Sequence, residues 1–152
     1  MADDAVYRAV FLRMHPTGKA VLSLSEASQG QEARLAQIAA DELGVPPEDI
    51  AVVHADTDRF GEGHSFNASA SPATEEKVAI TARRLRDKAQ TIAAHMLGTS
   101  PQGLRWDNGH WSVGRDGEGN VRIQAVALRA FAGESLPEGV EGGLDAQTTY
   151  RD

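Results

Sequence analysis

The sequence has 152 residues and no cysteine. The chain therefore has no disulfides, no cysteine ligands for zinc or an iron–sulfur cluster, and no thiol nucleophile. No apolar run approaches the length of about 18 residues that reads as a membrane-spanning helix. The N-terminus also lacks the charged-then-apolar pattern of a signal peptide. We therefore expect a cytoplasmic protein.

Positive charge is in short supply, with 15 Lys and Arg against 22 Asp and Glu and a net charge of −7. A surface of this sign repels phosphate backbones and anionic lipid, so we expect neither nucleic acid nor a membrane as a partner. Apolar residues make up 41% of the chain and charged residues 24%, a normal globular balance. The length and this balance predict a single domain over residues 1–152.

The first half of the chain predicts a hairpin, a helix and a strand. Residues 6–14 are mostly apolar at both parities, which predicts a strand buried on both faces, paired across a turn with a second strand at 20–24. Ser28 and Gln31 have capping-box spacing, so a helix is expected over about 29–43, ended by Gly44. A short strand follows at 50–54.

The second half begins with an irregular stretch at 55–72, a length typical of a functional or mobile loop. The apolar stripe after it predicts a long helix over 72–97. Four further elements are expected: a hairpin at 104–113, a turn at 116–120, a short helix at 121–131 and a last strand at 147–150. The fold class is therefore α+β, a mixed or antiparallel sheet packed by two main helices and a short third one.

Titratable side chains concentrate in the irregular stretch and at its edges. The run contains His54, Asp56, Asp58, Glu62 and His64. One interpretation is an acid/base cleft, in which Glu62 is the favoured proton acceptor and His64 its partner. The other is a solvated polar loop whose aspartates cap turns. Glu26, at the strand-to-helix junction, is a further candidate acid.

A metal site is the weaker interpretation of the same run. The alternation of His54, Asp56 and Asp58 suits ligands on a strand, and the aspartates also resemble the start of a calcium loop. However, Phe60 occupies the third ligand position of such a loop, and Asn67 stands where glutamate belongs. We therefore expect no metal site.

Three stretches together resemble one family. Residues 28–59 (SQGQEARLAQIAADELGVPPEDIAVVHADTDR), 82–97 (ARRLRDKAQTIAAHML) and 143–152 (GLDAQTTYRD) are similar, in the same order, to segments of the molybdenum hydroxylases. These segments belong to the large, molybdopterin-binding subunits of xanthine dehydrogenase, aldehyde oxidase and aerobic carbon monoxide dehydrogenase. In that family a Gly-Gln-Gly motif starts a cofactor-binding helix. The resemblance therefore implies that Gln29, Gly30 and Gln31 would hold a pterin or another anion.

The sequence also departs from the family pattern. Ser28 stands where the motif has its first glycine, and the loop after Asp58 keeps Gly61 and Gly63 but not the family's proline and arginine. The segment that carries the family's catalytic glutamate has no counterpart in these residues. From this we expect no cofactor in the isolated chain.

These observations leave three hypotheses of function. The first is a cofactor-free acid/base enzyme acting on a small organic substrate by cyclisation, condensation or isomerisation. The alternatives are a molybdopterin-binding partner subunit of a split hydroxylase, which would be an oxidoreductase only within a larger complex, and a non-catalytic binding module. In each case exposed apolar faces and sheet edges favour a homodimer or a partner subunit.

Overall fold

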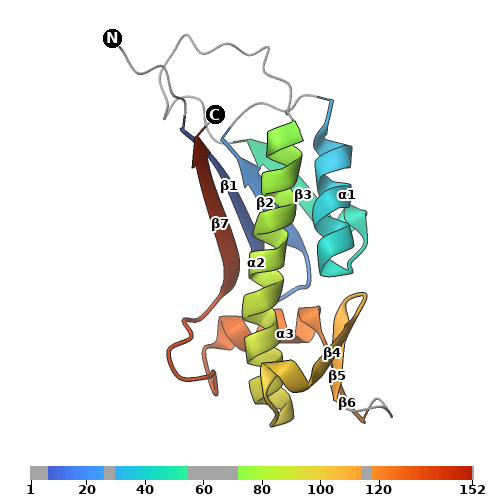
Figure 1. Ribbon diagram of the computed structural model, residues 1–152, viewed down its shortest axis with the longest axis vertical. Coiled ribbons are helices and arrows are strands. Elements are labelled where there is room, and N and C mark those ends of the chain that lie inside the picture. Colours follow the sequence, from blue (N-terminus) through green and yellow to red (C-terminus); the bar gives the residue numbers. More distant parts are fainter. Residues whose placement is uncertain (1–6, 26–29, 55–71, 114–117, 152) are drawn as a thin grey trace.

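Four strands form the main sheet of the protein. Figure 1 shows a computed structural model that describes residues 7–25, 30–54, 72–113 and 118–151. The strands are β1 (Tyr7–Met14), β2 (Ala20–Leu24), β3 (Ile50–His54) and β7 (Leu144–Arg151), in the order β3-β2-β1-β7. β1 pairs antiparallel with β2 and β7, whereas β2 and β3 are parallel. A helix must therefore connect β2 to β3.

Two helices cover one face of this sheet. They are α1 (Glu32–Leu43), which lies between β2 and β3 in the chain, and α2 (Pro72–Leu97) beside it (Figure 1). A third helix, α3 (Ile123–Ala132), lies near the last turns of α2. No helix among the described residues, α2 included, has the length and apolarity needed to cross a membrane.

A second, smaller sheet lies at the α3 end of the molecule. Its strands are β4 (Leu104–Asp107), β5 (His110–Val113) and β6 (Glu118–Arg122), in that order. Two single 3₁₀ turns, η1 (Pro47–Asp49) and η3 (Pro101–Gly103), precede β3 and β4. The β4–β5 turn uses positive φ at both Asn108 (41°) and Gly109 (103°), the backbone that Asn-Gly favours in a two-residue hairpin.

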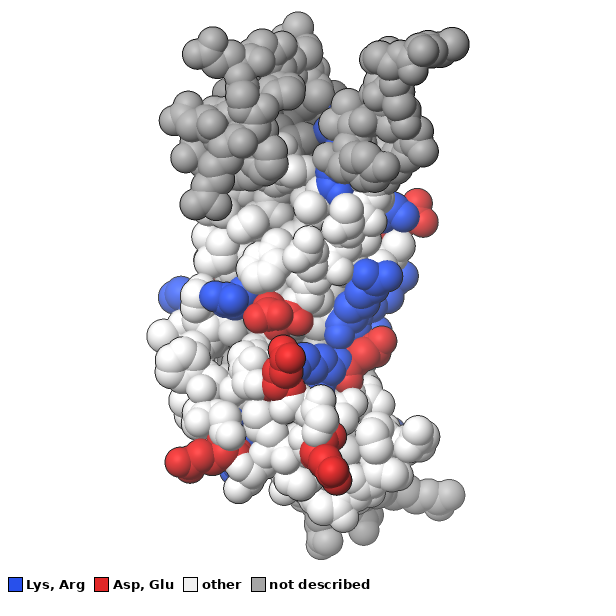
Figure 2. All heavy atoms as spheres, turned by 90° about the vertical axis from the view of Figure 1, so that its left-hand side faces the viewer, with Lys and Arg blue, Asp and Glu red and all other residues white. Residues whose placement is uncertain are grey.

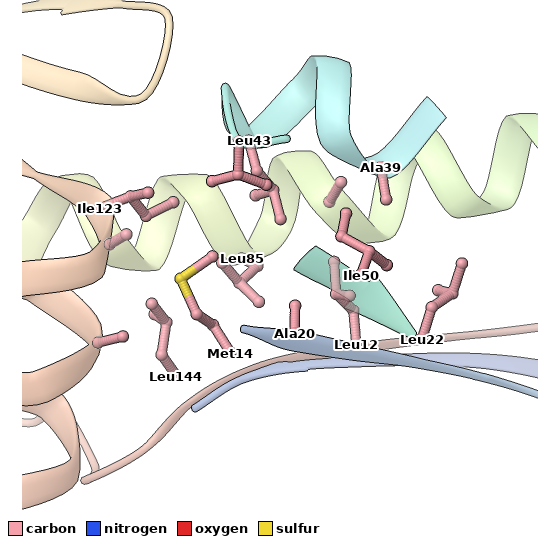
Figure 3. Packing of buried hydrophobic residues seen from close by; sticks show 14 of the residues in the cluster. Leu12, Met14, Ala20, Leu22, Ala39, Leu43, Ile50, Leu85, Ile123 and Leu144 are labelled. Atoms are coloured by element: carbon pink, nitrogen blue, oxygen red, sulfur yellow. The ribbon is translucent and has the colours of Figure 1, made fainter. Parts of the chain in front are cut away.

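The core fills the space between the main sheet and its two helices. Figure 3 shows Leu12, Leu22 and Ile50 of the sheet facing Ala39 and Leu43 of α1 and Leu85 of α2. Even-numbered residues of β1 point into this layer, and Val10, Leu12 and Met14 are at most 2% exposed. Aliphatic side chains therefore supply most of the free energy of folding here.

The predicted α+β class and the order of its elements are confirmed. The prediction of a first strand buried on both faces is wrong, because both helices lie on the same face of the sheet. Ala9 and Phe11 on the opposite face are only half-buried, and Arg13 is exposed. Apolar residues at both odd and even positions of the strand do not require two covered faces, since alanine and phenylalanine can stay half-exposed.

Three predicted boundaries also differ from the structure. α1 begins at Glu32, three residues after the expected start, with Gln31 as its N-cap. Residues 118–120 of the predicted turn and the first two residues of the predicted helix at 121–131 form β6, which pairs with β5; residues 116 and 117 lie outside the described residues. The last strand covers 144–151 instead of 147–150, because its whole length pairs with β1. Pairing partners distant in sequence set these limits.

Candidate functional site

Six elements have an end at one edge of the main sheet. β2, β3 and β7 finish there, and β1, α1 and α2 begin there (Figure 1). The N-terminal end of a helix carries partial positive charge and unpaired N–H groups, so this end of the molecule favours an anionic ligand. The unit β2-α1-β3 contributes the parallel part of the arrangement. In open parallel α/β sheets, ligands bind beyond the carboxyl ends of the strands, and β2 and β3 are the parallel pair of this mixed sheet.

Gly30 is the described residue that precedes Gln31 and α1. Gly30 has φ of 83°, a conformation that other residues rarely adopt. A Cβ added there would meet no atom of the described residues within 4 Å. Among the described residues, no side chain therefore stands against this part of the backbone.

Gln31, the N-cap of α1, has an unusual side chain. It makes no capping hydrogen bond to the helix. Its amide oxygen Oε1 is buried, yet within the described part of the chain it has no hydrogen-bond partner. A buried acceptor left unpaired costs free energy, so a group that donates a hydrogen bond is expected opposite this oxygen.

Glu32 occupies the first turn of α1 beside Gln31. Its Oε2 accepts the backbone N–H of Gly30 at 3.0 Å, and its Oε1 lies 3.5 Å from Nε2 of His54 at the end of β3. A hydrogen bond from its own backbone N–H is the main factor that lowers the pKa of Glu32, and His54 and the Gly30 N–H act in the same direction. The carboxylate thus takes up N–H donors that an incoming anion would use.

Two contacts fix the start of α2 at this end. Arg34 of α1 reaches Glu75 in the first turn of α2, with Nε 3.2 Å from Oε1. The hydroxyl of Thr74, which is fully buried, lies 3.1 Å from the hydroxyl of Tyr150 near the end of β7. These contacts hold the starts of both helices in place relative to the sheet.

The structure describes only part of the predicted site. Glu26, Gln29, Asp56, Asp58, Glu62 and His64 lie outside the described residues, so their proposed roles stay predictions. Gly30 and Gln31 lie where the resemblance expects them, before α1. The proximity of Glu32 and His54 was missed, although the strand–helix–strand order of 20–54 places a helix start and a strand end at one edge of the sheet.

Comparisons with known proteins assign the chain to a family. A family model described as a molybdopterin cofactor-binding domain matches residues 2–152. The chain belongs to this family. The carbon monoxide dehydrogenase large chain of Afipia carboxidovorans is 33% identical over 150 residues, 96% of this chain and 18% of that one. The nicotine 6-hydroxylase large subunit of Paenarthrobacter nicotinovorans is 31% identical over 149 residues, again 18% of its length.

Solved structures of such enzymes contain the same fold. In CO dehydrogenase from Oligotropha carboxidovorans, 94% of this chain superposes with a TM-score of 0.81 at 32% identity. In quinoline 2-oxidoreductase from Pseudomonas putida 86, 95% superposes with a TM-score of 0.75 at 29% identity. The matched region is 18% and 19% of those chains. This molybdopterin cofactor-binding domain therefore spans less than a fifth of its relatives.

The expectation that the chain has no cofactor is wrong. The family model and the CO dehydrogenase relatives point instead to molybdopterin binding. The expectation gave too much weight to the family segments, such as the one with the catalytic glutamate, that have no counterpart in these residues. It gave too little to the start of α1, where a glycine with positive φ precedes a glutamine with an unpaired amide oxygen.

Proposed function

We propose that this domain forms one wall of a molybdopterin site in a hydroxylase of the CO dehydrogenase and xanthine dehydrogenase type. The observation that carries the proposal is the unpaired Oε1 of Gln31, buried at the start of α1 in a chain of this family. A pterin ring presents N–H groups at its edge, and an amide oxygen is a suitable acceptor for them. The donor and acceptor chemistry of these residues therefore fits the cofactor.

Each residue at the start of α1 would have a separate part in holding the cofactor. Gln31 would accept a hydrogen bond from the pterin, and the backbone at Gly30 would lie against the ligand because no side chain intervenes. The positive end of α1 would favour phosphate oxygens. When bound, the molybdenum cofactor supplies the redox chemistry of hydroxylation. The domain itself would orient the pterin and shield it from water.

Glu32 opposes an anion at this position. Its carboxylate accepts the Gly30 N–H at 3.0 Å, so a phosphate could use that donor only after the carboxylate turns away. Two negative charges close together repel, and solvent and salt weaken this repulsion at an exposed carboxylate. Glu32 therefore tunes the strength of anion binding and does not prevent it.

This proposal favours the molybdopterin-binding subunit over the cofactor-free acid/base enzyme. The comparisons lend no support to a cyclase or to a role in biosynthesis. The acids and the histidine proposed for such an enzyme, apart from His54, also lie outside the described residues. The small-molecule substrate and the partner subunits of the hydroxylase stay part of the proposal, because the matched region is less than a fifth of each relative.

Cofactor retention tests the proposal directly. The chain and its Gln31→Met variant would be purified from a host that makes molybdenum cofactor, and pterin would be measured by fluorescence after oxidative release. Methionine keeps the length of the side chain but removes the acceptor oxygen, and a hydrogen bond to a buried group is worth about 1–2 kcal/mol. We expect the variant to retain roughly 5- to 30-fold less pterin than the original chain.

Gln37→Met is the matched control, because Gln37 lies on the exposed side of the same helix and donates to Asp41 at 2.7 Å. This variant should retain pterin like the original chain. Absence of pterin from the original chain, when the host has cofactor to spare, would refute the proposed function. Equal retention by both glutamine variants would show that Gln31 is not the acceptor.

A further inference from the structure

α3 is apolar on nearly every side. Of its ten residues, all but Gln124 and Arg129 are apolar. Ile123, Val126, Ala127 and Ala130 are buried against the rest of the molecule. On the outward side, however, Leu128 is 56% exposed and Phe131 70% exposed. A helix that is apolar all round is normally covered on all sides, so this side has the character of a contact surface.

A hollow adjoins the exposed phenylalanine. It has a volume of about 250 Å³, and Met14, Pro16, Phe131 and Leu144 line it, with Arg13 and Asp145 among its polar residues. Pockets for small molecules usually measure about 300–1,000 Å³, and this one falls below that range. Its size and its apolar lining instead suit one large side chain of a protein.

The protruding Phe131 and the hollow lie next to each other, and this makes the surface self-complementary. In a two-fold dimer the same patch is used twice, so residue i of one copy meets residue j of the other and the reverse. Phe131 of each copy can then occupy the hollow of its partner. We propose that the outward side of α3 and this hollow form the contact surface for a second copy of the chain.

The charges around the surface are compatible with such pairing. Arg13 and Asp145 form an ion pair at the hollow, with Nη2 3.5 Å from Oδ2. The segment after α3 exposes Glu134, Glu138 and Glu141, whereas Arg129 lies on α3 itself. Figure 2, which faces the β7 side, shows basic and acidic side chains next to each other in a band across the molecule. Both signs at one surface let the acids of one copy face the arginines of the other, despite the net charge of −7.

The area of the α3 surface determines how stable a dimer we expect. A ten-residue helix is about 15 Å long, and with a width of about 10 Å its outward side covers roughly 150 Å². A stable interface needs about 800 Å² per partner. The contact must therefore extend over the turn at 15–19 and the segment 133–143, which flank α3. We expect a weak dimer that dissociates in the micromolar range.

Sedimentation velocity on the full chain and on its Phe131→Asp variant tests the dimer. An aromatic residue at the centre of an interface is commonly worth 2 kcal/mol or more. We therefore expect the variant to raise the dissociation constant about 30-fold or more. Val53→Asp is the matched control, because Val53 is an exposed apolar residue (42%) on β3, away from α3. It should leave the dissociation constant unchanged.

A second measurement locates the contact without disturbing it. The chain has no cysteine, so one cysteine introduced by Ala132→Cys or Val53→Cys can carry a single spin label. A dimer through α3 gives a shorter distance between labels for Ala132→Cys than for Val53→Cys. A monomeric original chain at about 100 µM, well above the expected micromolar range, would overturn the proposal. So would a dimer that Val53→Asp weakens and Phe131→Asp does not.

Discussion

The two ends of the main sheet present opposite kinds of surface. Where β2 and β3 finish, the start of α1 offers backbone N–H groups, the amide of Gln31 and the charge of Glu32. At the other end, α3 offers the exposed side chains of Leu128 and Phe131. The first kind of surface selects a small polar ligand by hydrogen bonds, whereas the second selects only shape and apolar area. The proposed ligand and the proposed second copy would therefore bind at opposite ends of the domain.

Substitutions in the core between the two ends should cause the largest loss in the free energy of unfolding. Comparing one of them with a substitution on α3 tests whether the outward side of α3 is exposed. Leu85 of α2 is fully buried, whereas Leu128 of α3 is 56% exposed. Leu85→Ala should lower the free energy of unfolding by about 2–5 kcal/mol, because it leaves a cavity in the packed layer. Leu128→Ala should change it by about 0.5 kcal/mol or less.

Denaturant titration at one fixed, low protein concentration measures both variants. The low concentration matters because dissociation of a dimer would add to the free energy of unfolding. An equal loss for the two leucine variants would mean that α3 is covered in the monomer. The claim that α3 presents an exposed apolar surface would then be wrong.

Much of the fold could be predicted from the sequence because local signals mark its elements. Gly44 ends α1 with φ of 67°, and the Asn108-Gly109 pair turns the β4–β5 hairpin. Local signals do not report which face of a strand is covered. The half-buried Phe11 lies under Arg13, whose guanidinium carbon is 5.4 Å from the centre of the ring. A cation stacked on an aromatic ring thus replaced the second layer that the pattern predicted.

The candidate site was predictable only through its motif. The resemblance placed Gly30 and Gln31 at a helix start, and both precede α1 in the structure, whereas their binding role stays a prediction. The contact between Glu32 and His54 joins residues 22 positions apart, and no local pattern reports such a pairing. The acids and the histidine that dominated the sequence argument lie outside the described residues, so the contrast between the two ends does not depend on them.

Removing a hydroxyl group between α2 and β7 should cause the next largest loss in the free energy of unfolding. The Thr81 hydroxyl lies 2.6 Å from the carbonyl oxygen of Lys77, within α2, and 2.7 Å from the hydroxyl of Thr148 on β7. Both threonines are buried. Thr81→Val keeps the shape but removes a partner of Thr148, so unfolding should require about 1–3 kcal/mol less.

Thr91→Val is the control for this substitution. Thr91 makes the same kind of contact within α2, to the carbonyl oxygen of Asp87 at 3.3 Å, but it is only partly buried. Its replacement should change the free energy of unfolding by about 0.5 kcal/mol or less. A similar loss for both variants would mean that the helix contact, and not the link to β7, stabilises this part of the molecule.

The smallest expected change in stability comes from replacing Glu32. It tests how the charge at the start of α1 contributes to the fold and to ligand binding. The pKa of Glu32 is lowered in the folded chain, so its ionised form stabilises the fold. That contribution is fully present above the ordinary pKa of 4.5 and is lost as the pH falls through the lowered value. Glu32→Gln should therefore melt slightly below the original chain at about pH 7, and the difference should shrink as the pH falls below 4.5.

Glu138→Gln removes the same charge from an exposed position in the segment after α3, and it serves as the control in the same thermal melts. Its difference from the original chain should not follow the pH dependence seen for Glu32→Gln. At neutral pH, Glu32→Gln should also retain more pterin, because the repulsion between the carboxylate and a phosphate is gone. A variant that melts lower and also retains less pterin would show that Glu32 supports the cofactor site. The negative charge at the start of α1 would then belong to the binding surface and would not compete with it.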